Sequence, residues 1–182
     1  MKIVYQGKTK TGKDIIIRYP QLGDEAELLN FINKLSDEKT FITYQGEHET
    51  LESEAKFLNS WLERIENKKS VVLLVFHGSL LIANALIGLQ DKTRKHVGLL
   101  AISVAKDFRG DGIGKLLMDL LIKEAKKELF GLKIVTLEVY STNSIAQSLY
   151  HKIGFVQYGA LPKGISRLGT FEDAILMYKN IK

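Results

Sequence analysis

One short segment combines three glycines with charged residues, and its sequence is Arg109-Gly110-Asp111-Gly112-Ile113-Gly114-Lys115. It stands directly before an apolar pattern that is typical of an amphipathic helix. The first backbone N–H groups of a helix have no partner inside the helix, and the peptide dipoles add partial positive charge there. Glycine lets a backbone approach a ligand closely. The segment is therefore predicted to bind an anion, best a phosphate or pyrophosphate. The alternative is a turn that needs glycine only for its shape.

The spacing of these glycines excludes two common nucleotide-binding motifs. A P-loop has four residues between its first glycine and a terminal Gly-Lys-Ser/Thr, and this segment lacks that spacing. The dinucleotide fingerprint is Gly-x-Gly-x-x-Gly inside a β-α-β unit, whereas the pattern here is Gly-x-Gly-x-Gly. A phosphate would have to be held by a different arrangement.

The elements that position this segment follow from hydrophobic periodicity. A strand is predicted at 97–104, before the segment, and the helix after it has apolar residues at Ile113, Leu116, Leu117, Leu120, Leu121 and Ala125. Other strands are predicted at 14–18, which is read as the first strand, and at 71–76, 80–89, 134–139, 155–158 and 174–178. Other helices are predicted after Asp24, read as an N-cap, near 50–67 and at 144–152. This order predicts an α/β or α+β domain around a mixed sheet.

Composition limits the classes of protein that the chain can belong to. It has 182 residues, of which 45% are hydrophobic and 26% charged, as in ordinary globular proteins. No apolar run of about 18 residues is present, so we expect neither a membrane-spanning helix nor a membrane partner. With no cysteine and no apolar leader, we expect no metal site, no disulfide and a cytoplasmic location. The net charge of +5 is concentrated in the second half, but no arginine-rich tract points to nucleic acid.

Two motifs together resemble a known family. Arg109-x-x-Gly112-x-Gly114, between a strand and an amphipathic helix, resembles the acyl-CoA motif of the GNAT N-acetyltransferases. A second motif follows at the expected separation, with Leu137-Glu138-Val139 and then Asn143-x-x-Ala146-x-x-Leu149-Tyr150-x-x-x-Gly154-Phe155. The segment 173–179 resembles the closing strand of the family. The resemblance is close over 97–179 and rests on element order alone over 1–90.

The resemblance implies one N-acetyltransferase domain over 1–182, with a mostly antiparallel central sheet flanked by helices and acetyl-CoA as cosubstrate. In the family, the strand before the turn diverges from its neighbour and pairs with the pantetheine arm, while the turn amides hold the pyrophosphate. The cofactor-binding residues implied here are Ile102, Ser103, Val104, Arg109, Gly110, Asp111, Gly112, Ile113, Gly114, Lys115 and Asn143.

The resemblance also implies a general acid. Tyr150 matches the tyrosine that protonates the departing thiolate, and a phenol can supply that proton. Without the family pattern, Tyr150 would be interpreted as a core aromatic residue. No carboxylate stands on the strand 97–104, where many members place the base. Glu138 on the next strand is a candidate base, although it could simply face outward; His96, a water relay and an already neutral amine are alternatives.

The acceptor is the least defined part of this interpretation. Four glutamates within eight residues, Glu47, Glu49, Glu52 and Glu54, could attract a cationic amine or simply favour the start of a helix. Aromatic residues that could line an acceptor slot are Phe41, Tyr44, Trp61 and Phe171. The segment 161–170 is predicted to be a mobile loop over the site.

The sequence leaves three functions open, and we expect the first of them. The first is acetyl transfer to a small primary amine by direct attack in a ternary complex. The second is transfer to a protein N-terminus or lysine, and the third is acyl-CoA binding without transfer. An enclosed acidic pocket would favour the small amine, whereas an open groove would favour a peptide. A homodimer is one arrangement that the sequence allows.

Overall fold

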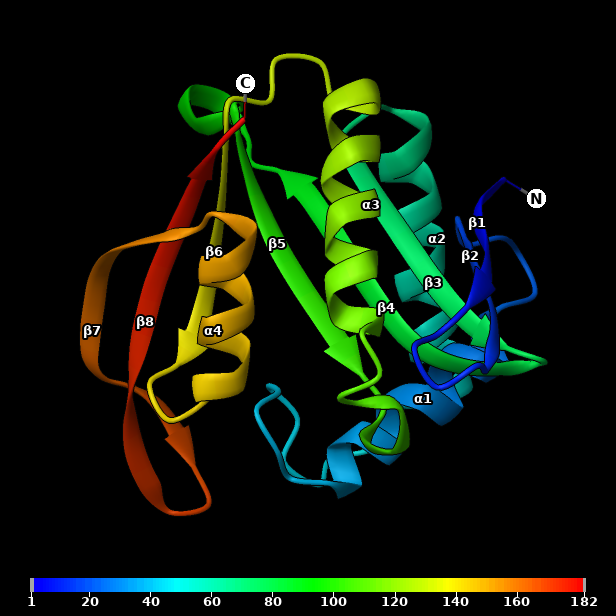
Figure 1. Ribbon diagram of the computed structural model, residues 1–182, viewed down its shortest axis with the longest axis horizontal. Coiled ribbons are helices and arrows are strands. Elements are labelled where there is room, and N and C mark those ends of the chain that lie inside the picture. The colour runs from blue at the N-terminus through cyan, green and yellow to red at the C-terminus, as the bar shows by residue number, and fades with distance from the viewer. Residues whose placement is uncertain (1, 182) are drawn as a thin grey trace.

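The computed structural model describes residues 2–181, which form one sheet with helices on both faces (Figure 1). The strands are β1 Ile3–Lys8, β2 Asp14–Arg18, β3 Ser70–His77, β4 Leu80–Leu89, β5 Val97–Val104, β6 Ile134–Tyr140, β7 Val156–Arg167 and β8 Thr170–Asn180. The α-helices are α1 Glu25–Asp37, α2 Leu51–Glu66, α3 Ile113–Glu128 and α4 Ser144–Ile153, and two short 3₁₀ turns lie at Lys92–Arg94 and Lys106–Phe108. The predicted mixed α/β architecture is confirmed.

The eight strands are ordered β1-β2-β3-β4-β5-β6-β8-β7. Every neighbouring pair is antiparallel except β5 and β6, which are parallel and are connected through α3. A parallel pair needs such a crossover connection, whereas antiparallel neighbours can be joined by short turns. The sheet is therefore mixed and mostly antiparallel, as expected.

Two apolar layers hold the helices on the sheet, with α3 and α4 on the front face and α1 and α2 behind it (Figure 1). The central strand β3 is buried on both faces, and alternate residues belong to different layers. Leu73 packs in the layer under α3, whereas Leu74 packs in the layer under α1 and α2. This follows from the two-residue period of a strand, and it explains why β3 is a continuous apolar run.

Two strand predictions need correction. The structure begins with β1, so the strand predicted at 14–18 is the second one. The segment 161–170, predicted as a loop, belongs to the β7–β8 hairpin, whose turn is Leu168-Gly169 with φ angles of 49° and 77°. Strand β1 has no fully buried residue and β7 is mostly exposed, so both lack the alternation that reveals a buried strand. Register shifts in β7 accommodate its proline and glycines.

Asp24 is the N-cap residue of α1, as predicted, but its side chain does not do the capping. Helix α1 does begin directly after it, but the Asp24 side chain makes no capping hydrogen bond. Its carboxylate instead accepts two hydrogen bonds from the buried Arg18 guanidinium, at 2.7 and 2.6 Å, and one from the amide of Gln21. The buried ion pair takes precedence because an unpaired buried guanidinium would be costly.

Across the described residues 2–181, no helix combines the length and apolar character that a membrane crossing requires. The same residues contain no cluster of three or more metal-ligating side chains.

Candidate active site

Strands β5 and β6 separate along their length, and this opens the sheet next to the glycine segment. Their parallel pairing covers only Val97 to Leu99 on β5. Beyond that point β6 pairs with β8 alone, while Ile102–Val104 pair only with β4 among the described strands. Figure 1 shows the two strands diverging toward the end of β5. The side of β5 that faces β6 is therefore free to hydrogen-bond with a ligand, as the resemblance implied.

The predicted turn directly follows that open edge and begins α3. Gly110 and Gly112 have φ angles of +80° and +82°, and Gly112 is the left-handed residue before the first residue of the helix. No described residue accepts a hydrogen bond from the backbone amides of residues 110–115. We call residues 110–115 the glycine cradle. Its free amides and the positive end of the helix dipole are suited to a phosphate group.

The third glycine of the cradle has a packing role. A Cβ on Gly114 would lie 3.3 Å from Cδ2 of Leu149 on α4. Glycine thus lets α3 and α4 approach closely at the mouth of the gap between β5 and β6. This positions α4, and with it Tyr150, relative to the cradle.

The tip of the β1–β2 hairpin is fastened to the cradle, which the sequence did not reveal. Asp111 is buried, and its carboxylate accepts hydrogen bonds from the amide and hydroxyl of Thr11, at 2.8 and 2.7 Å, and from Lys13 Nζ. Burial alone would raise the pKa of Asp111, but these hydrogen bonds hold it well below its usual value. Asp111, predicted as a cofactor residue, therefore uses its side chain to hold the hairpin.

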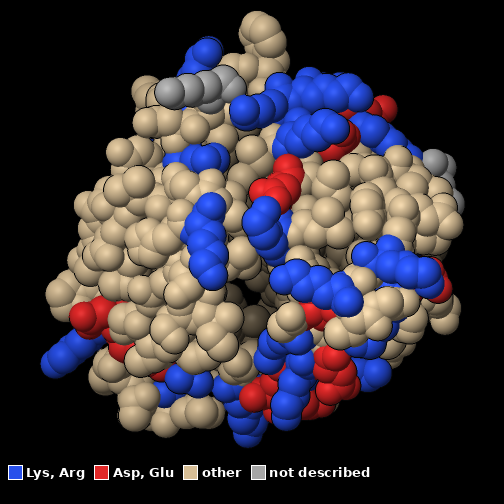
Figure 2. Space-filling view, viewed as in Figure 1, with Lys and Arg blue, Asp and Glu red and all other residues tan. Residues whose placement is uncertain are grey.

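This contact brings additional positive charge to the cradle. The side chain of Lys10 lies against Gly112, and a cavity of about 250 Å³ between hairpin and helix is lined by Lys8, Lys10 and Lys115, among other residues. Figure 2 shows Lys and Arg side chains gathered around a hollow on this face, near the start of α3. The sequence signal was the lysine-rich stretch 8–13, which is far from the cradle along the chain.

Two predicted basic residues are already engaged in ion pairs. Arg109 donates to the carbonyl of Val104 at 2.9 Å and pairs with Glu38, directly after α1, at 2.5 Å. Lys115 pairs with Asp119 at 2.6 Å, one helical turn away. Arg109 therefore fixes the end of β5 relative to the turn, while Lys115 remains exposed beside the cavity.

Tyr150 lies in α4 and is 93% buried, with its ring 6.0 Å from that of Phe155. The described residues offer no hydrogen-bond partner to its hydroxyl. Burial raises the pKa of this phenol to about 12. The group is thus protonated at neutral pH and has its O–H available to a ligand. The ring is a core aromatic, as the alternative interpretation of Tyr150 expected, and the role of its hydroxyl as a general acid stays a prediction.

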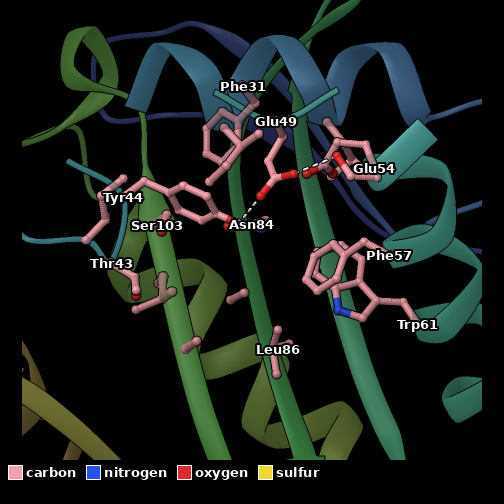
Figure 3. Close-up of a pocket in the computed structure, with 17 residues that line it drawn as sticks. Phe31, Thr43, Tyr44, Glu49, Glu54, Phe57, Trp61, Asn84, Leu86 and Ser103 are labelled. Atoms are coloured by element: carbon pink, nitrogen blue, oxygen red, sulfur yellow. Dashed lines mark hydrogen bonds between the residues drawn. The ribbon is translucent and has the colours of Figure 1, made fainter. Parts of the chain in front are cut away.

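A second cavity lies on the opposite face of the sheet, under α1 and α2 (Figure 3). Its volume is about 410 Å³, and we call it the Glu54 cavity. Its lining is mostly apolar and comprises Leu28, Phe31, Ile32, Ile42, Thr43, Tyr44, Glu49, Ser53, Glu54, Phe57, Trp61, Asn84, Ala85, Leu86, Ala101, Ile102 and Ser103. Because Ile102 and Ser103 belong to the open end of β5, this cavity reaches the same strand as the cradle from the other side.

The charged residues in this lining are both acidic. Glu49 accepts hydrogen bonds from the Tyr44 hydroxyl at 2.7 Å and the Ser53 hydroxyl at 2.6 Å, and these bonds lower its pKa. Glu54 is 95% buried, and burial, followed by the charge of Glu49, raises its pKa. Of the four predicted glutamates, Glu47 and Glu52 lie outside the cavity and are exposed.

The sequence of the chain identifies its family. The model of the acetyltransferase (GNAT) family matches residues 30–155. The chain belongs to the GNAT family of acetyltransferases. It is accordingly an acyltransferase, and the resemblance drawn from the two motifs is confirmed. No curated protein sequence matches the chain.

Solved GNAT structures share this fold. A GNAT acetyltransferase from Streptococcus pneumoniae is 30% identical, with a TM-score of 0.84, and the match covers 92% of this chain and 99% of that one. The yncA structure from Salmonella typhimurium, solved with its cofactor acetyl-CoA, is 19% identical with a TM-score of 0.79 over 92% and 94% of the two chains. A ribosomal-protein-alanine N-acetyltransferase from Brucella melitensis is 24% identical, with a TM-score of 0.78 over 91% and 99%.

The structure also gives the surroundings of the remaining candidate site residues. Asn143 caps α4, since its side chain accepts from the amide of Ala146 at 3.1 Å. Glu138 is exposed on β6 and lines neither cavity. Tyr44 and Trp61 line the Glu54 cavity, whereas Phe41 and Phe171 do not, and Phe171 is 68% exposed.

Proposed function

We propose that this GNAT protein transfers an acetyl group from acetyl-CoA to a small primary amine, with residues 1–182 acting as one N-acetyltransferase domain. The observation that carries this proposal is the separation of β5 from β6 directly before the glycine cradle. A free strand edge and a set of free turn amides then follow one another along the chain. They suit a ligand with amide groups in an extended arm and a pyrophosphate at its end.

The residues of the cradle fit such a donor. The amides of residues 110–115 would hold the pyrophosphate, and the edge formed by Ile102, Ser103 and Val104 would pair with the pantetheine arm. Lys10 and Lys115 would add positive charge beside the phosphates. Acetyl-CoA, when bound, supplies a thioester whose carbonyl carbon an amine can attack.

Tyr150 is proposed as the general acid. Attack by the amine nitrogen forms the new C–N bond, and the C–S bond then breaks with its electron pair going to sulfur. A proton on that sulfur makes it a better leaving group, and the Tyr150 hydroxyl would donate it and recover a proton from solvent. Its raised pKa keeps the proton in place until the thiolate forms. Asn143 would act by fixing the start of α4, which carries this tyrosine.

The proton of the attacking amine has no assigned acceptor on β5, because that strand contains no carboxylate. Glu138 does not line the Glu54 cavity, and this weakens its candidacy as the base. We propose that the amine enters the reaction already neutral or loses its proton to water.

A small acceptor is favoured over a protein because the segment between α1 and α2 is fixed across this face. The Tyr140 hydroxyl of β6 donates to the carbonyl of Ile42 at 2.9 Å, and the Phe41 ring lies 5.4 Å from the Tyr140 ring. The Arg167 guanidinium of β7 lies over both rings. The acceptor would then occupy the Glu54 cavity, whose volume suits a small molecule.

Calorimetric titration of the purified protein with acetyl-CoA tests the donor site, with dephospho-CoA as the matched control. We expect saturable binding that weakens when the 3′-phosphate is absent. Thiol release is then followed with small amines and with peptides that carry a free N-terminus. Faster turnover of peptides would favour the protein acceptor, and no binding at millimolar acetyl-CoA would overturn the function.

A further inference from the structure

Glu54 is a buried residue whose carboxylate opens onto a cavity and has no partner among the described residues. Its residue is 95% buried on the first turns of α2, and its side chain lines the Glu54 cavity. Among the described residues, no side chain or amide donates a hydrogen bond to its carboxylate, and none forms an ion pair with it. Buried carboxylates are ordinarily paired or hydrogen-bonded because burial removes their hydration. A residue in this state indicates that its partner is a ligand.

The carboxylate of Glu49 adds a second negative charge to the cavity, and no cationic residue of the lining balances it. Glu49 is held in place by hydrogen bonds from Tyr44 and Ser53, and its backbone amide donates to the Asn33 side chain of α1 at 2.8 Å. Glu49 thus stays in the cavity, where its charge opposes ionisation of Glu54. A cation placed beside the two carboxylates would favour their ionised forms and compensate the buried charge.

The cavity has two distinct ends (Figure 3). Thr43, Tyr44 and Ser103 lie on one side, next to β5, whereas Glu54, Phe57 and Trp61 come from α2 on the other side. Between the ends, Phe31 and Leu86 supply apolar surface, and Glu49 and Asn84 also lie there. An amine bound at Glu54 would therefore be held away from the strand edge at which the thioester is expected.

Aromatic rings complete the Glu54 end. The rings of Phe57 and Trp61 lie 4.5 Å apart, and both residues line the cavity beside Glu54. Aromatic faces next to a carboxylate favour an ammonium group, because the ring quadrupole attracts a cation. The apolar surface of Phe31 and Leu86 favours a methylene chain, and the lining offers no basic residue to an anion.

We propose that Glu54, with Glu49 beside it, binds a second cationic group of the acceptor, so that the preferred acceptor is an aliphatic diamine. One amine is held at the Glu54 end, the methylene chain crosses the apolar surface between the ends, and the other amine reaches β5 and is acetylated. This inference rests on the proposed acetyltransferase function, and it specifies the acceptor class.

Three four-carbon amines test the subsite on the unaltered protein. Putrescine carries two ammonium groups, n-butylamine carries one, and γ-aminobutyrate replaces the second ammonium with a carboxylate. We expect kcat/KM for putrescine to exceed that for n-butylamine by about 30-fold, the factor expected for one buried ion pair. We expect γ-aminobutyrate to be the poorest of the three. Equal values for putrescine and n-butylamine would overturn the proposal.

A matched pair of variants locates the effect. Glu54→Gln removes the charge with little change in shape, while Glu52→Gln makes the same change at an exposed residue of α2 that pairs with Lys56. We expect Glu54→Gln to lower kcat/KM for putrescine about 30-fold and to lower it much less for n-butylamine, so that the preference for the diamine is lost. Glu52→Gln should change neither. An equal loss with both amines in Glu54→Gln would show a structural role instead and overturn the subsite.

Calorimetry separates this inference from the proposed function. Putrescine is titrated into the CoA-bound protein, and the unaltered chain is compared with Glu54→Gln. Circular dichroism first checks that both are folded. If the unaltered chain binds putrescine and Glu54→Gln does not, the subsite is supported. If, in addition, no amine releases thiol, acetyl transfer is overturned but the subsite is not. Transfer to n-butylamine without any binding of putrescine would overturn the subsite and leave the transfer function intact.

Discussion

The two faces of the sheet carry different kinds of candidate binding site. On the α3 face, the glycine cradle offers backbone amides and a helix N-terminus, and its specificity lies in the conformation of a single short segment. On the α1–α2 face, the Glu54 cavity is lined by side chains from α1, α2, their connection, β4 and β5. A backbone site needs fixed residue types at fixed spacing, whereas a side-chain cavity can be assembled from many combinations. One face therefore carries a family motif and the other carries what is specific to this chain.

The faces also differ in charge. The cavity beside the cradle is lined by three lysines and two aspartates, while both charged residues of the Glu54 cavity are glutamates. Under the proposed function, this difference would favour an anionic donor and a cationic acceptor on opposite sides of β5. The strand itself is the shared wall, because Ile102 and Ser103 contribute to both the free edge and the rear cavity.

The most disruptive test of this contrast is Gly112→Val. At a φ of +82° a β-branched side chain is strained, and its Cβ would lie 2.9 Å from Cε of Lys10. We expect acetyl-CoA binding to be abolished in calorimetry. Gly131→Val is the matched control, since Gly131 has a φ of +83° and open space around the added Cβ, away from the cradle. Loss of binding in both variants would point to general strain and contradict a specific role of Gly112.

Tyr150→Phe tests whether the α3 face also supplies the chemistry. The change removes the hydroxyl and keeps the buried ring, so we expect kcat to fall about 10²-fold while acetyl-CoA affinity stays the same. Steady-state kinetics and calorimetry measure the two quantities separately. Tyr158→Phe, at an exposed tyrosine of β7, is the control and should match the unaltered protein. An unchanged kcat in Tyr150→Phe would remove this residue from the mechanism.

The contrast between the faces explains what the sequence could predict. The strand 97–104 and the long helix after it were predicted closely, because both have strong apolar periodicity and the turn between them needs glycine. The divergence of β5 from β6 followed from the family resemblance and is confirmed by pairing that ends at Leu99. The edge strand β1 was missed and β7 was predicted too short, because strands without buried residues leave little hydrophobic pattern.

For the Glu54 cavity, the sequence could supply only a set of candidate residues. The four glutamates at 47–54 were noted, but only Glu49 and Glu54 turn inward, and the choice depends on how α2 packs on β3 and β4. The contact of Thr11 with Asp111 joins residues 100 positions apart and left no local signal. Long-range contacts of this kind are set by the packing of the whole sheet and not by neighbouring residues.

Lys10→Ala sharpens the electrostatic side of the comparison. Lys10 is exposed and lies against Gly112, so we expect a loss of acetyl-CoA affinity of about two- to fivefold, the range for a solvent-screened ion contact. The loss should shrink at high salt. Lys123→Ala, on the exposed side of α3 outside the cradle, removes the same charge and should have no effect in the same titration. Equal losses in both variants would indicate a general effect of net charge.

The smallest expected effect is in the pH dependence of kcat on the alkaline side. An ordinary tyrosine loses its proton near pH 10, but burial raises the pKa of Tyr150 to about 12. A raised pKa keeps the phenol in its acid form to higher pH, and its function is lost only as pH rises through the shifted value. At saturating amine and acetyl-CoA, kcat should therefore change less than about twofold between roughly pH 8 and 10.5. If kcat instead falls around pH 10 while circular dichroism shows an intact fold, the general acid is a solvated group. The proton donor would then lie outside the buried α3 face.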